Sequence, residues 1–195
     1  MSISWMGGLE GGCMNEIEKK LYILSRLEKE IFKSLLRLKG AVSTYEVIKD
    51  IIENYFRKLS EKISLLCELK TIDYKQQRVK ICDRTIPIMN LFSDTFFPGK
   101  IYVPLDKFAS AVNEYFPKIG SAKNETEAVK YKKELLRQFF PFPSYRRIER
   151  ILNELVAIEL VVSRKDSGGK GKNLYAVNPE CLEYCKDIVG RLENG

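Results

Sequence analysis

Side chains that make paired hydrogen bonds recur along one predicted helix, at Arg146, Arg150 and Asn153. Spacings of four and then three residues place these groups in a line on one helical face, with Tyr145 and Arg147 beside its N-terminal end. Guanidinium and carboxamide groups match the hydrogen-bonding edges of guanine and adenine, and the first turns of such a helix can reach the major groove. The pattern therefore predicts that these five residues contact DNA, with the arginines and Asn153 reading base edges.

A second basic group follows in the segment 164–172, which reads RKDSGGKGK. It lies between two β-type runs, Val161–Ser163 and Asn173–Val177, so we expect a hairpin with a flexible, glycine-rich tip. Glycines allow a close approach to a phosphate backbone, and lysines act there as point charges. The cations that we expect to contact phosphate are Arg164, Lys165, Lys170 and Lys172.

Positive charge is concentrated around these two groups. The chain of 195 residues has 33 Lys plus Arg against 26 Asp plus Glu, a net charge of +7. Thirteen basic and seven acidic residues lie between Lys118 and Lys172, so this segment alone carries +6. A localised excess of positive charge favours a polyanionic partner more strongly than a basic total does, and duplex DNA is the partner expected here.

The same side chains also have simpler explanations. Glu149 and Glu154 lie within one helical turn of the arginines and could pair with them as ordinary surface residues. The lysines of 164–172 could equally be solvent-exposed residues of a mobile turn, without a ligand. The sequence leaves these alternatives open.

Enzyme chemistry finds little support in the residues present. The sequence has no histidine, which removes the commonest general base and every Ser-His or Cys-His nucleophile. It also lacks the GxxxxGK[ST] phosphate loop and a GxGxxG motif after a strand. Its five cysteines are an odd number without zinc-ligand spacing, and Cys181 and Cys185 read as buried residues of a terminal helix. We therefore expect no enzyme, no metal site and no cofactor.

The helix that carries the arginines is predicted over Ser144–Leu160, with Ser144 as its N-cap. Its inward face is expected to consist of Ile148, Ile151, Leu152, Leu155 and Leu160. Two helices are expected before it. One starts at Leu105 and stops at Pro117 to Gly120, and the next starts at its cap, Asn124, and reaches Phe139 or Phe140.

In the N-terminal half, an apolar stripe over residues 15–39 predicts one helix that ends at Gly40. The sequence STYE, from Ser43 to Glu46, predicts a capping box that starts another helix. Apolar positions then continue to Leu69 without Gly or Pro, which allows either one long helix or two. Two helices, followed by short strands within Thr71–Asp83, would match a winged-helix order, whereas one long helix predicts a helical hairpin suited to self-association.

Residues 105–178 resemble winged-helix domains of archaeal replication initiators and transcriptional regulators. The resemblance lies in the order helix, helix, helix ending in ILNELVAIELV, strand, basic glycine-rich wing, strand. Residues 26–83 resemble such a domain more loosely, so the whole chain is similar to a tandem archaeal winged-helix replication initiator. The resemblance implies that the third helix enters the major groove and that the wing touches phosphate or the minor groove.

The expected fold class is mainly α with small β-hairpins (α+β), with two winged-helix-like domains in tandem. Residues 179–195 are expected to form a C-terminal helix, after Pro179. The other expected boundaries are a disordered tail over 1–14, a helical or winged-helix-like and dimerising domain over 15–90, a linker over 91–104 and a winged-helix DNA-binding domain over 105–178.

The expected function is double-stranded DNA binding, in transcription regulation or at a replication origin. A homodimer would address two adjacent sites, and replication or transcription proteins are the further partners expected. No run of eighteen apolar residues occurs, so no membrane partner is expected and the protein is placed in the cytoplasm, with the nucleoid. The alternative is a tandem winged-helix adaptor in a replication or chromosome-maintenance complex, for which DNA contact is incidental.

Overall fold

The computed structural model describes residues 16–68, 86–87, 102–103, 105–139, 142–166 and 172–182. The helices are α1 (Glu16–Ile23), α2 (Arg26–Leu38), α3 (Thr44–Glu68), α5 (Leu105–Gly120), α6 (Glu125–Arg137) and α7 (Tyr145–Ala157). The strands are β1 (Val42–Ser43), β2 (Ile86–Pro87), β3 (Tyr102–Val103), β4 (Val161–Lys165) and β5 (Asn173–Val177). A mainly helical protein with a small antiparallel sheet confirms the predicted α+β class. Among the described helices, none has the length and apolarity needed to cross a membrane.

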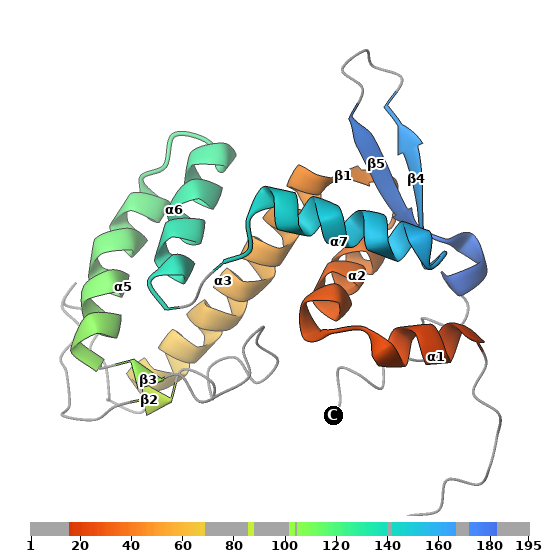
Figure 1. Cartoon of the computed structure of the whole chain (residues 1–195). Coiled ribbons are helices and arrows are strands. Elements are labelled where there is room, and N and C mark those ends of the chain that lie inside the picture. Colours follow the sequence, from red (N-terminus) through yellow and green to blue (C-terminus); the bar gives the residue numbers. More distant parts are fainter. Residues whose placement is uncertain are drawn as a thin grey trace, which may run out of the picture.

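The larger sheet has three antiparallel strands in the order β1-β5-β4. Strand β5 lies in the middle, where Tyr175 is opposite both Val42 of β1 and Ser163 of β4. Strands β4 and β5 form the predicted hairpin, and Figure 1 shows it projecting away from the helices. A second, two-stranded sheet pairs β2 with β3.

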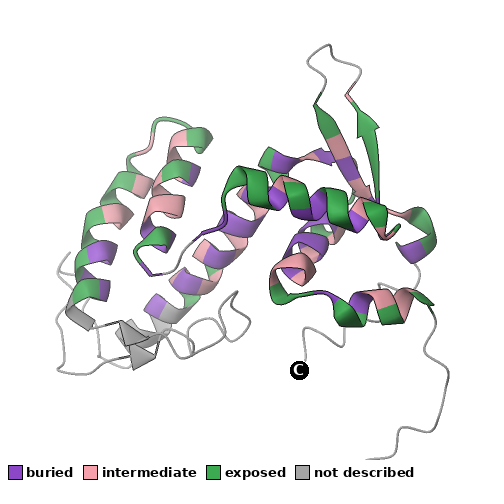
Figure 2. Cartoon of the chain, in the orientation of Figure 1, coloured by how far each residue is buried: buried purple, intermediate pink, exposed green. Residues whose placement is uncertain are grey.

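Three helices, α2, α3 and α7, pack together beside the three-stranded sheet. Their facing surfaces supply the most deeply buried aliphatic side chains, including Ile31, Leu35, Ile51, Ile148 and Leu152 (Figure 2). Each aliphatic side chain of this size contributes roughly 1.5–3 kcal/mol when it is removed from water. This burial is what holds α7 in place, and all five inward residues predicted for it are buried.

The first predicted helix is in fact two. The helical stripe is interrupted at Leu24 and Ser25, where a capping box starts α2: Glu28 N–H donates to Ser25 Oγ and Ser25 N–H donates to Glu28 Oε2. The end of α2 also differs from the prediction, because the left-handed residue there is Lys39 (φ 50°), not Gly40.

Helix α3 is continuous, which confirms the single-helix alternative. The predicted capping box is present, since Ser43 N–H donates to Glu46 Oε2 at 2.6 Å and Glu46 N–H donates to Ser43 Oγ at 3.3 Å. The predicted strands within Thr71–Asp83 lie outside the described residues.

Helices α5 and α6 form a hairpin that packs on α3 through α6 (Figure 1). Lys132 of α6 donates to both carboxylate oxygens of Glu53 at 2.8 and 2.6 Å, and its Nζ lies 4.9 Å from the centre of the Phe56 ring. Asn124 caps α6 as predicted. Helix α5 contains Pro117 and ends at Gly120, within the range predicted for its end.

The sheet joins two stretches of chain that were predicted to be separate domains. Strand β1 belongs to the range 15–90, whereas β4 and β5 belong to 105–178, and buried residues of both ranges form one core. A tandem pair of winged helices is therefore not confirmed. Of the predicted linker 91–104, β3 is described, and it is paired with β2. The predicted tail over 1–14 lies outside the described residues, and of the C-terminal helix only 179–182 are described, as a helical turn.

Candidate nucleic-acid interface

The N-terminal half of α7 presents the predicted base-reading residues to solvent. Ser144 caps the helix, its Oγ accepting from the N–H of Arg147 at 3.3 Å. The α7 residues predicted to bind DNA are all exposed: Tyr145, Arg146, Arg147, Arg150 and Asn153. None of these side chains is turned into the core, so the outer face of α7 is the polar face that the sequence predicted (Figure 2).

Helix α7 ends three residues earlier than predicted, at Ala157. Leu160 N–H donates to Leu155 O and Glu159 N–H donates to Val156 O, the two hydrogen bonds of a Schellman motif. Glu159 takes the left-handed position of that motif, with φ 64°. Leu160 is nevertheless buried, because the turn directs it into the core, from which β4 begins.

Arg150 has an acidic neighbour on its own helix. Its Nε lies 3.4 Å from Glu154 Oε1, and both side chains are largely exposed, at 70% and 52%. Exposed pairs of this kind contribute roughly 0–1 kcal/mol, so the guanidinium can exchange the carboxylate for another partner at small cost. The pair is the surface contact that the simpler explanation expected, but it does not bury the arginine.

Asn153 is held differently. Its Oδ1 accepts a hydrogen bond from the Tyr175 hydroxyl at 3.0 Å, across the space between α7 and β5. Tyr175 is fully buried, and this burial raises the pKa of its phenol, so the hydroxyl keeps its proton at neutral pH. The contact places the outer face of α7 directly beside the three-stranded sheet.

The hairpin carries the second predicted group of cations. Arg164, Lys165 and Lys172 are exposed, and Lys170 lies outside the described residues. Beyond the last strand pair, Asp166 N–H donates to Lys172 O at 2.8 Å, which keeps the two arms together where the basic segment starts. Within β4 only Val161 is buried, so the strand leaves the core at once and extends into solvent.

Strand β4 is also an edge of its sheet. Charged residues on edge strands discourage pairing with other chains, which gives Arg164 and Lys165 a structural role besides any ligand.

The arrangement brings most of the predicted site residues onto neighbouring elements. The arginines lie along α7, the lysines on the hairpin that follows it, and the Asn153–Tyr175 hydrogen bond joins the two. Such a surface offers bidentate donors beside a row of flexible cations.

Comparisons with family models, with curated proteins and with solved structures found no match to this chain.

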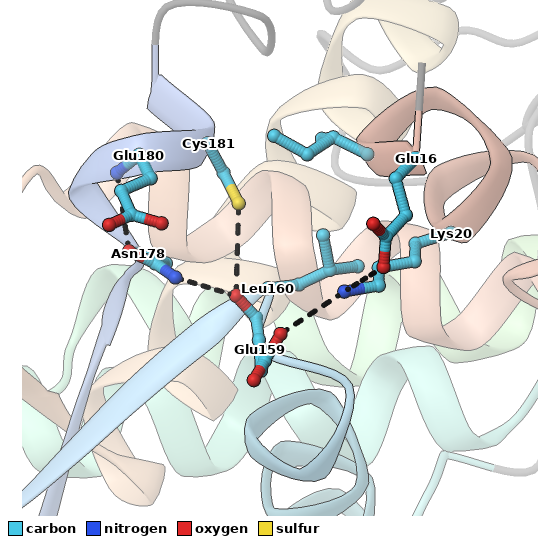
Figure 3. Close-up of a pocket in the computed structure, with 8 residues that line it drawn as sticks. Glu16, Lys20, Glu159, Leu160, Asn178, Glu180 and Cys181 are labelled. Carbon is cyan, nitrogen blue, oxygen red and sulfur yellow. Dashed lines mark hydrogen bonds and ion pairs between the residues drawn. The ribbon is translucent and has the colours of Figure 1, made fainter. Parts of the chain in front are cut away.

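A pocket of about 290 Å³ lies at the opposite, C-terminal end of α7 (Figure 3). In it the Nζ of Lys20, on α1, lies 3.3 Å from a carboxylate oxygen of Glu16 and 3.3 Å from one of Glu159. The backbone carbonyl of Glu159 accepts hydrogen bonds from Asn178 Nδ2 at 2.8 Å and from Cys181 Sγ at 3.8 Å. These polar groups of the pocket are therefore hydrogen-bonded or ion-paired with one another. Their contacts connect α1 to the end of α7. Among the described residues, no cluster of three potential metal ligands is present.

Tyr175 belongs to the surface formed by α7 and the β4–β5 hairpin, and the sequence analysis did not predict it there. The alternation in β5 could have placed Tyr175 and Val177 on the buried side of the strand, and both are buried. No local pattern indicates that the hydroxyl reaches Asn153, because the contact depends on how α7 packs against the sheet.

Proposed function

We propose that this protein binds double-stranded DNA, with the outer face of α7 in the major groove and the β4–β5 hairpin along the phosphate backbone. The observation that carries the proposal is the exposed line of Arg146, Arg150 and Asn153 beside a solvated basic hairpin. Guanidinium and amide groups on a helical face supply the donors that base edges accept, and the hairpin supplies the charge that phosphates attract.

The order of the packed elements supports the same proposal. Helices α2, α3 and α7, followed by β4 and β5, give three helices and then a two-stranded wing, and β1 completes the sheet. In this proposal the chain contains one winged helix built from both halves, and the α5–α6 hairpin is an insertion between its second and third helices. The winged helix then spans the predicted domain boundary, and α7, β4 and β5 form it together with α2, β1 and α3.

The test is selection of bound duplexes from a random pool at moderate salt, followed by titrations of the selected sequence. Arg146→Ala and Arg150→Ala should each relax the preference at one base pair by about 1–3 kcal/mol. Lys165→Ala and Lys172→Ala should weaken binding to all sequences alike. Each should also lower the slope of log K against log salt by about 0.9 for every phosphate that the variant no longer neutralises.

Lys19→Ala is the matched control, since Lys19 is an exposed cation on α1, away from the hairpin. It should leave both the preference and the salt slope unchanged. Equal losses from the control and the α7 variants, or no duplex binding at all, would contradict the proposal. Enrichment of paired half-sites would add that the protein acts as a homodimer.

One observation favours the second candidate function, a protein-interaction adaptor. Tyr22 and Ile23 are adjacent at the end of α1 and are exposed at 76% and 74%, although both are large apolar residues. Exposed apolar residues next to one another are typical of protein-binding surfaces. Duplex binding that ignores sequence and disappears by about 200 mM salt would favour this function over a sequence reader.

A further inference from the structure

We infer that Tyr175 is a positioning residue, which turns the Asn153 carboxamide so that its NH₂ group, and not its oxygen, faces a base edge. The inference rests on the proposed function and names one element of its specificity. It also changes the role of Asn153 from the adenine reader that the sequence predicted to a reader of acceptor groups.

The geometry places one partner rigidly and leaves the other accessible. Tyr175 is completely buried, and its strand β5 is hydrogen-bonded on both sides, to β1 and to β4. Its hydroxyl therefore occupies a fixed position at the surface end of the ring. Asn153 is exposed on α7, yet its Oδ1 lies 3.0 Å from that hydroxyl.

The direction of the hydrogen bond decides what Asn153 can offer. Paired recognition of adenine requires the amide oxygen to accept from the base while the NH₂ group donates to it. Here the oxygen is turned toward Tyr175, so the two N–H donors of the planar amide point away from Tyr175 and are left for a ligand on this exposed residue. Guanine presents two acceptors, N7 and O6, in the major groove, whereas adenine presents one acceptor next to a donor. We therefore expect guanine over adenine at the base pair that Asn153 faces.

The phenol is protonated at neutral pH, because tyrosine ordinarily has a pKa of about 10 and burial raises the pKa of Tyr175 further. A hydroxyl that keeps its proton continues to donate to Oδ1, so the amide orientation holds at neutral pH.

The test combines Tyr175→Phe with two readouts. The variant keeps the buried ring and removes only the hydroxyl. In duplex selection, we expect the guanine preference at a single base pair to fall by about tenfold, with affinity for an unrelated duplex unchanged within about twofold. In NMR spectra of the free protein, the Asn153 side-chain amide signals should shift and show increased mobility.

Two further variants separate positioning from a general effect on the fold. Tyr145→Phe removes a hydroxyl from an exposed tyrosine of the same surface, and it should leave the Asn153 amide signals in place. Asn153→Asp keeps an oxygen to accept from Tyr175 but has no N–H donors, so it should lose the guanine preference even if Tyr175→Phe unfolds.

The outcomes distinguish this inference from the proposed function. Sequence-selective binding that survives Tyr175→Phe and Asn153→Asp with its base preference intact would overturn the inference and leave the function standing. Unchanged Asn153 amide signals in a folded Tyr175→Phe variant would also overturn it. If the wild-type protein binds no duplex, both fail together.

Discussion

Among the residues that the structure describes, two that are not glycine hold a backbone conformation that usually belongs to glycine. Lys39 at the end of α2 and Glu159 after α7 have φ values of 50° and 64°. A side chain in the left-handed region costs about 1–2 kcal/mol, because its Cβ approaches the following carbonyl oxygen. Both helices therefore end in the usual left-handed turn, but with a strained residue in it. The end of α2 was predicted at Gly40 because glycine takes this conformation without strain, whereas the structure has Lys39 there.

Lys39→Gly should stabilise the protein by about 0.5–1 kcal/mol, since the strain relieved exceeds the extra freedom that glycine gains on unfolding. The free energy of unfolding from urea titrations measures this. Gly40→Ala is the control: a Cβ there comes no closer than 3.9 Å to Leu38 O, so the change should be neutral or slightly stabilising. A lower stability of Lys39→Gly would show that the lysine side chain stabilises the fold by more than the strain costs.

At this scale the sequence predicted exposure better than contact. The outward direction of Arg146 and Arg150 follows from the apolar stripe on the other side of α7, and both are exposed. The partner of Asn153 could not be predicted in this way, because Tyr175 is 22 positions away in the chain and the two meet only through packing.

At the scale of elements, the α5–α6 hairpin contacts α3 through apolar packing and through one polar contact in a partly buried place. The Lys132 side chain is only 16% exposed, against 38% for Glu53, and it lies over the Phe56 ring. The opposite arrangement occurs on the surface of α3, where Arg57 and Glu61 pair at exposures of 64% and 59%. Both carboxylates belong to α3, but the Glu53–Lys132 pair is more deeply buried than the Arg57–Glu61 pair.

Glu53→Ala should destabilise the protein by about 1–3 kcal/mol, because it leaves the ammonium of Lys132 largely buried without its carboxylate. Glu61→Ala, the matched control on the same helix, should cost less than about 1 kcal/mol. Both are measured by chemical denaturation. Equal losses from the two variants would mean that burial at Lys132 is too slight to matter.

Helix starts were the most predictable part of these elements. Asn124, Ser144 and the Ser43–Glu46 box were expected and are present, since each is a local hydrogen bond written in a few residues. The box at Ser25 and Glu28 has the same signature, but the apolar stripe runs through it without interruption and indicated a single helix. Helix α5 ends at Gly120, inside the predicted range of 117–120, although it includes Pro117, which lacks the N–H that an interior helical position uses.

At the scale of the whole molecule, the sheet decides which parts of the chain can fold alone. Helix α7 buries Ile148, Leu152 and Leu155 in the core that it shares with α2 and α3. Strand β5 is paired with β1 from the N-terminal half. The division into two domains was predicted from composition and proline spacing, which carry no information about a two-residue strand that pairs with the far end of the chain.

A fragment of residues 105–195 should therefore lack a cooperative fold. Without α2, α3 and β1, the inner face of α7 is left open to water, and each of its aliphatic side chains forgoes roughly 1.5–3 kcal/mol of burial. We expect its NMR spectrum to show poor amide dispersion and its unfolding to lack a sharp transition. Co-expression with residues 1–104 should restore the dispersion and the sharp transition. An independently folded fragment would instead support the tandem arrangement.

The pairing of Val42 with Tyr175 also sets an order of events during synthesis. The ribosome synthesises β1 early, whereas its pairing partner β5 is synthesised about 130 residues later. Closing so long a loop is slow compared with forming local helices, and until it closes the apolar sides of α2 and α3 stay uncovered. Exposed apolar surface makes a nascent chain most prone to aggregation during such an interval, and the surface formed by α7 and the β4–β5 hairpin is completed only at its end.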